Sequence, residues 1–134
     1  MQSLDLPGDR WLSFSRVLDQ IVVRCRDVQL PFAVVYAPAA VQYDPAATFE
    51  RSLGIHIRPE WLTMESELER RLEAWAAASH VPLLSLTSEL RSAAARQPGA
   101  FNFEFDTHWN ARGHEVAARA IETWLRTQRL VPGR

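Results

Sequence analysis

The run Phe32-Ala33-Val34-Val35-Tyr36-Ala37 decides the fold class of this chain. It is continuously apolar, rich in β-branched residues, and shows no alternation of apolar and polar positions. Such a run predicts a strand buried on both faces, as in a parallel sheet covered by helices. Pro31 precedes the run and Pro38 follows it. Because proline lacks a backbone N–H, we expect Pro31 to end the preceding helix and Pro38 to end the strand.

Amphipathic helices are expected on both sides of this strand. Upstream, apolar residues recur every three or four positions from Arg10 onward and form one face, consisting of Trp11, Phe14, Leu18, Ile21, Cys25 and Val28. Downstream, a second helix is expected to begin near Pro59, with Glu60 and Glu65 near the positive end of its dipole. Its apolar stripe consists of Trp61, Met64, Leu68, Leu72 and Trp75.

Three further elements follow along the chain. The run from Val81 to Leu86 predicts a second short strand, and residues 88 to 96 predict a short helix capped by Ser88. A last helix is expected from about Asn110 to Gln128. Strands separated by helices imply parallel strands joined by crossovers, so the predicted class is α/β.

The predicted architecture is a partial three-layer open parallel sheet flanked by helices. We expect one α/β domain over residues 10 to 130, after a leader at residues 1 to 9. Two strands alone would leave unpaired backbone groups at the sheet edges. The chain therefore looks like the later half of a larger open-sheet domain.

Composition excludes several classes of function. The chain has 134 residues and a net charge of −1, which predicts no broad attraction to nucleic acid or to an anionic membrane. Every basic residue is arginine, so a catalytic lysine is excluded. Cys25 is the only cysteine, which excludes an intramolecular disulfide. No apolar run approaches the about 18 residues of a transmembrane helix, and no signal-peptide pattern is visible.

The densest group of polar residues is Asp106-Thr107-His108-Trp109-Asn110-Ala111-Arg112-Gly113-His114. A carboxylate two positions before a histidine in a turn can orient the ring, whose other nitrogen can then take a proton from a nucleophile. We expect Asn110 to cap the last helix. His114 is expected either to support the site or to pack, and Trp109 to pack.

The loop from residue 39 to 57 follows the first strand and could form one wall of a pocket. Tyr43 and Asp44 are its best polar candidates, although a plain turn explains them equally well. His56 and His80 are isolated in the sequence, and we expect both at the surface.

The block Asp-x-His-Trp-Asn-x-x-Gly-His, followed by an Ala-rich amphipathic helix, resembles the C-terminal end of the SGNH hydrolases, also called GDSL-like esterases. It looks like the branch related to alginate O-acetyltransferases. The predicted strands look like the last two of that family, and the resemblance covers residues 10 to 127 as an architecture. It implies Asp106 as the orienting acid and His108 as the general base.

The resemblance also implies a reaction class and a setting. The expected substrate is an acyl ester, carbohydrate esters included, and the expected chemistry is cofactor-free Ser-His-Asp hydrolysis or acyl transfer. Relatives of this branch often act in the bacterial envelope.

The family's nucleophilic block is missing from this chain. That block has a Gly-Asp-Ser pattern, whereas the Gly8-Asp9 pair here is followed by Arg10. The asparagines are Asn102 and Asn110, and neither lies upstream where the family's oxyanion hole is expected. We therefore expect a truncated, split or decayed enzyme that is inactive alone. The nucleophile would come from a missing N-terminal segment or from a partner chain.

Two other functions remain open from the sequence. Asp-x-His also begins the metal block of dinuclear metallophosphatases, with His114 as a third ligand, but their Gly-Asn-His and Gly-His-x-His blocks are absent. Alternatively, half of a split sheet would expose an apolar edge and act as a non-catalytic interaction module for a partner chain.

Overall fold

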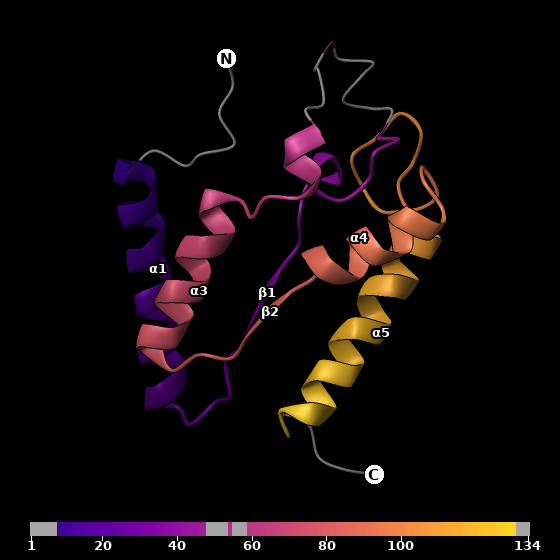
Figure 1. Ribbon diagram of the computed structural model, residues 1–134. Helices are drawn as coiled ribbons and strands as arrows, with labels where there is room; N and C mark the ends of the chain where they lie inside the picture. Colours follow the sequence, from indigo (N-terminus) through magenta and orange to yellow (C-terminus); the bar gives the residue numbers. More distant parts are fainter. Residues whose placement is uncertain (1–7, 48–53, 55–58, 131–134) are drawn as a thin grey trace. The chain divides into compact units, whose positions relative to one another are not determined.

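The computed structural model describes residues 8–47, 54 and 59–130 (Figure 1). Helices and strands follow one another as α1 (Gly8–Asp27), β1 (Val34–Tyr36), η1 (Ala40–Gln42), η2 (Pro59–Leu62), α3 (Glu67–Ser79), β2 (Leu83–Ser85), α4 (Thr87–Arg96) and α5 (Ala111–Thr127). The two η elements are short 3₁₀ helices. Helix α1 begins at Gly8, inside the predicted leader.

Strands β1 and β2 pair with each other as a small parallel sheet. The backbone N–H of Val34 donates to the Pro82 carbonyl at 2.9 Å, and the N–H of Leu86 donates to the Tyr36 carbonyl at 3.0 Å. Both strands lie within the predicted apolar runs, and each is preceded and followed by helix. The broad α/β character expected from the sequence is therefore confirmed.

The strands are less buried than their apolar sequences predicted. In β1 Tyr36 is buried and Val34 is half-buried, but Val35 is 39 % exposed. All three residues of β2 are half-buried. The expectation of burial on both faces was wrong for the described residues, because a sheet of two strands cannot cover its own faces and edges.

The chain divides into two compact units, and the division passes through both strands. Unit 1 comprises residues 1–34 and 65–83, and unit 2 comprises residues 35–64 and 84–134. In unit 1 the Trp75 indole N–H donates to Asp19 Oδ1 at 2.8 Å, and the Arg26 guanidinium donates to the Ser79 carbonyl at 2.8 Å. Both contacts join the C-terminal half of α3 to α1.

The apolar face of α1 differs from the predicted one. Leu18 and Val22 are the buried residues of this helix, whereas Phe14 and Ile21 are exposed. Apolar side chains lie on more than one side of α1, so the helical period alone could not identify the buried side. Leu18 was predicted correctly, and Phe14, Ile21 and Val28 were not.

The helix predicted to begin near Pro59 is interrupted. Pro59–Leu62 forms only the short η2, and α3 begins at Glu67 after a break. The cause is Ser66, whose side chain accepts a hydrogen bond from the Glu69 backbone N–H at 3.0 Å. This cap satisfies an N–H that has no partner within the helix, so it sets the helix start at this point.

Unit 2 has a core of small and aliphatic side chains around α4 and α5. Leu86, Leu90 and Ala94 are almost completely buried, and helices α4 and α5 pack against each other. Helix α4 begins at Thr87, whose backbone N–H donates to the Ser85 hydroxyl. The predicted cap at Ser88 was therefore wrong, because Ser85 bonds the first turn of the helix.

The segment between β1 and α3 is tied to unit 2 by Arg91 on α4. Its guanidinium donates to the backbone carbonyls of Gln42 at 2.8 Å and Met64 at 2.6 Å. The described parts of this segment include the short helices η1 and η2. Across the described residues, no helix combines the length and the apolar character needed to cross a bilayer.

Candidate acid-base site

Asp106 and His108 form a hydrogen-bonded pair within one turn of unit 2. Asp106 Oδ1 accepts from the His108 backbone N–H at 3.0 Å and also pairs with the ring nitrogen Nδ1 of His108. The two side chains therefore lie on the same side of the turn. They are also open to solvent, with 80 % of the His108 side chain and 52 % of the Asp106 side chain exposed.

The pairing determines which nitrogen of the ring can act as a base. A carboxylate only accepts hydrogen bonds, so the Nδ1 that faces Asp106 carries the proton. The other nitrogen, Nε2, then presents a lone pair, and it has no partner among the residues that the structure describes. This arrangement allows the ring to accept a proton from a hydroxyl or water that approaches from outside.

The turn also stabilises the charged form of Asp106. The His108 backbone N–H and then the His108 ring lower the pKa of this carboxyl below its ordinary value. Both groups donate to the ionised carboxylate, which favours loss of its proton. Asp106 is therefore a carboxylate at neutral pH, as an orienting acid requires.

Asn110 connects the turn to α5. Its side-chain oxygen accepts from the backbone N–H groups of Arg112 at 2.9 Å and Gly113 at 3.2 Å, which confirms the predicted cap. Its amide nitrogen donates to the carbonyls of Ala100 and Asn102, each at 3.0 Å. One side chain therefore holds both the first turn of the helix and the chain that leads into the site.

Trp109 and His114 pack against each other beside the pair. Their rings meet edge to face, with centroids 5.8 Å apart and planes at 85°. Trp109 also packs on the core of unit 2, as predicted. His114 is exposed, its ring packs against Trp109, and among the described residues it forms no hydrogen bond with Asp106 or His108.

Gly113 allows this packing and was not recognised from the sequence as a structural residue. A Cβ atom at this position would lie 2.3 Å from the Phe101 carbonyl oxygen and 2.8 Å from the Trp109 Cβ. Only a residue without a side chain lets α5 approach the site loop so closely. Glycine inside a helix costs about 1 kcal/mol relative to alanine. A glycine in the first turn of the predicted helix therefore indicated a close contact at this position, and this signal was available from the sequence.

Tyr43 and Asp44 are buried inside unit 2. They are 2 % and 1 % exposed, respectively. The Asp44 carboxylate accepts from the backbone N–H of Gly99 at 3.0 Å and of Ala46 at 2.9 Å. The Tyr43 hydroxyl donates to Asn102 Oδ1. Both residues therefore support the chain on either side of Phe101, just before the site turn.

In the part of the chain that the structure describes, no other histidine and no serine joins the pair. His80 is exposed and ends α3 in unit 1, and His56 lies outside the described residues. No serine hydroxyl bonds to the His108 ring within the described part of the chain. The source of a nucleophile stays a prediction.

A metal site with three ligands is not formed by these residues. Within residues 8–47, 54 and 59–130, no three His, Cys, Asp or Glu side chains are grouped so as to hold a metal ion. Asp106, His108 and His114 therefore do not make the ligand set that the metallophosphatase alternative requires.

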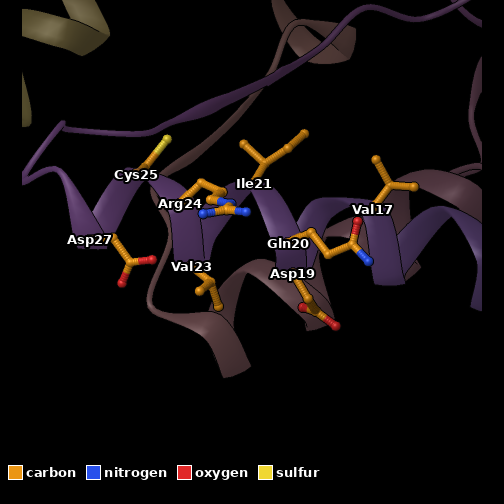
Figure 2. Close-up of a pocket in the computed structure, with 8 residues that line it drawn as sticks. All are labelled: Val17, Asp19, Gln20, Ile21, Val23, Arg24, Cys25 and Asp27. Atoms are coloured by element: carbon orange, nitrogen blue, oxygen red, sulfur yellow. The ribbon is translucent and has the colours of Figure 1, made fainter.

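An open groove runs along α1 in unit 1, and it differs in character from the polar turn. Figure 2 shows Val17, Ile21 and Cys25 projecting from one side of the helix, with Gln20 and Arg24 beside them. Val17 is 52 % exposed and Ile21 is 38 % exposed. This side of α1 presents apolar side chains to solvent.

In comparisons with known proteins, no family model, no curated protein and no solved structure matches this chain.

Proposed function

We propose that this chain supplies the acid and base of a Ser-His-Asp ester hydrolase or O-acyltransferase, in which Asp106 orients His108. The observation that carries the proposal is the pairing of Asp106 with His108 Nδ1 in an exposed turn at the head of a capped helix. The serine and the oxyanion hole come from a partner chain or from an adjoining segment. The substrate is an acyl ester, and no cofactor takes part.

In the proposed reaction, His108 Nε2 removes the proton of the incoming serine hydroxyl as that oxygen attacks the acyl carbonyl. The Asp106 carboxylate stabilises the imidazolium that forms and keeps the ring in its orientation. The ring then returns the proton to the alcohol that leaves. In the second half-reaction His108 activates water for hydrolysis, or a second alcohol for acyl transfer.

A partner chain also fits the apolar surface of the described residues. The exposed side of α1 and the two-stranded sheet are the features that a larger open-sheet domain would cover. In this proposal the added strands complete the three-layer sheet that the sequence predicted. The alternative is that the chain acts only as an interaction module, in which case the same surfaces bind a partner and the Asp106–His108 pair has no chemical role.

The test is to coexpress the chain with the products of the reading frames adjoining its own, and to purify complexes through a tag on this chain. Release of acetate from an acetyl ester is then measured. We expect turnover in an assembled complex, loss of nearly all of it in His108→Ala, and negligible turnover by the chain alone.

The matched control is His80→Asn, which removes a histidine of unit 1 and keeps a residue that tolerates the left-handed backbone at φ 53°. This control should retain full activity. Turnover that persists in His108→Ala, or no ester release by any complex, would contradict the proposed function. A complex that forms but never hydrolyses an ester would favour the interaction module.

A further inference from the structure

The peptide group between Thr107 and His108 is held from both of its sides. On one side the Asn102 amide Nδ2 donates to the Thr107 carbonyl at 2.8 Å. On the other side the His108 N–H of the same peptide donates to Asp106 Oδ1 at 3.0 Å. Because the C=O and N–H of a trans peptide point in opposite directions, these two contacts together fix the plane of this group.

Asn102 is itself held by Tyr43. The Tyr43 hydroxyl donates to Asn102 Oδ1, which leaves the amide Nδ2 directed at the Thr107 carbonyl. Nδ2 also lies 3.4 Å from the His108 carbonyl. The side chain of Asn102 thus contacts the backbone before and after the His108 Cα, and its orientation is determined by a partner outside the turn.

Tyr43 is a rigid point of attachment. It is 2 % exposed and belongs to the core cluster that includes Leu86 and Leu90. The next residue, Asp44, is bonded to the Gly99 N–H, so the backbone around Tyr43 is fixed to the chain that leads to the site. A buried, hydrogen-bonded aromatic residue has little rotational freedom, and it can therefore limit the motion of Asn102.

We propose that Tyr43 and Asn102 are positioning residues, which hold the 107–108 peptide so that its N–H and the His108 ring meet the Asp106 carboxylate. Neither residue touches the reacting atoms. Their effect on catalysis rests on the function proposed above, but their effect on the pair exists in the chain alone. A turn without this support would still allow Asp106 and His108 to meet, but for less of the time.

The competing explanation is that the Tyr43–Asn102 contact only stabilises the core. The two explanations differ in what they predict for Asp106. The His108 backbone N–H is the largest cause of the lowered pKa of Asp106, so loosening this peptide raises that pKa toward its ordinary value. A contribution to core stability alone would leave the pKa of Asp106 in the folded protein unchanged.

The experiment is a titration of the Asp106 carboxyl ¹³C resonance by NMR in the full-length, isotopically labelled chain. Tyr43→Phe removes the hydroxyl and keeps the ring, and Asn102→Ala removes the other partner. We expect both variants to raise the pKa of Asp106. Tyr36→Phe is the matched control, because Tyr36 is also a buried tyrosine of unit 2 but its hydroxyl bonds to Gln42.

Three results would overturn the proposal. One is an unchanged pKa of Asp106 in both Tyr43→Phe and Asn102→Ala. Another is an equal rise in Tyr36→Phe, which would mean that any lost hydroxyl in this unit has the same effect. The third is a rise of the Asp106 pKa in Asn102→Ala but not in a folded Tyr43→Phe variant, which would show that Tyr43 is not a positioning residue.

If Tyr43→Phe fails to fold, Asn102→Ala decides the result, since Asn102 is only half-buried. The titration uses the isolated chain, so its outcome is independent of whether any complex hydrolyses an ester.

Discussion

Gly113→Ala should destabilise the protein, although the same change stabilises most helices. The new Cβ would lie 2.3 Å from the Phe101 carbonyl oxygen, so the two atoms must separate by roughly 0.7 Å to reach the 3.0 Å below which such contacts essentially never occur. Overpacking of this kind costs about 1–3 kcal/mol. The upper part of that range applies here, because the obstacle is backbone and a second contact is made with Trp109.

Helix propensity offsets part of this cost. Alanine is favoured over glycine in a helix by about 1 kcal/mol. The free energy of unfolding should therefore fall by a net ~1–2 kcal/mol in Gly113→Ala. Urea unfolding followed by circular dichroism measures the difference.

Two controls separate the clash from helix propensity. Ala118→Gly, at an exposed position of the same helix, should cost about 1 kcal/mol and so gives the propensity difference in α5. Gly8→Ala should not destabilise, since nothing lies within 4 Å of its Cβ position. A Gly113→Ala variant that is as stable as the unchanged chain, or more stable, would show that α5 and the site loop are not closely packed at this position.

Three further changes test the site turn, the helix cap and the core of unit 2. Asp106→Asn should lower the free energy of unfolding at pH values above the ordinary pKa of an aspartate. This loss should shrink as the pH falls through the lowered pKa of Asp106, because a carboxyl whose pKa is depressed by folding stabilises the protein only while it is ionised. Urea midpoints between neutral and acid pH measure the loss, and a loss that does not change with pH would contradict the prediction. Asn110→Ala should cost ~2 kcal/mol in urea unfolding, at the upper end for a helix cap, because two amide donors are lost as well; a cost below about 0.5 kcal/mol would count against the cap. Leu90→Ala, at a fully buried position, should cost about 2–5 kcal/mol, whereas Leu12→Ala, at an exposed position of α1, should cost far less; equal losses would mean that the core is misplaced.

The parts of the site that depend on neighbours in sequence could be predicted from sequence. A carboxylate can reach the backbone N–H and the ring of a histidine two positions later, and this is the contact that Asp106 makes. Asn110 precedes a periodic apolar pattern and caps the helix that follows. Both predictions needed only the geometry of a turn and of a helix start.

The support of the turn could not be predicted in the same way. Tyr43 and Asn102 are 59 positions apart, and Asp44 and Gly99 are 55 positions apart. In each pair the two residues lie on opposite sides of β2 and α4 in the sequence, so no local pattern brings them together. Tyr43 and Asp44 were recognised as polar candidates, but nothing local distinguished a buried support from a pocket wall.

The buried side of α1 could not be chosen from sequence for a different reason. The positions around Leu18 and Val22 and those around Val17 and Ile21 both satisfy a helical period. Hydrophobicity alone gives no preference between two apolar faces. In the structure Asp19 and Arg26 also bond to α3, and these polar residues were not part of the apolar pattern.

If Asp106 holds the His108 ring with Nε2 as its basic nitrogen, ¹⁵N NMR of the two ring nitrogens will show which of them carries the proton. At a pH where the ring is neutral, we expect a protonated Nδ1 and an unprotonated Nε2, and a loss of this preference in Asp106→Ala. A ring that carries its proton on Nε2, or the same tautomer ratio with and without the Asp106 carboxylate, would contradict the claim.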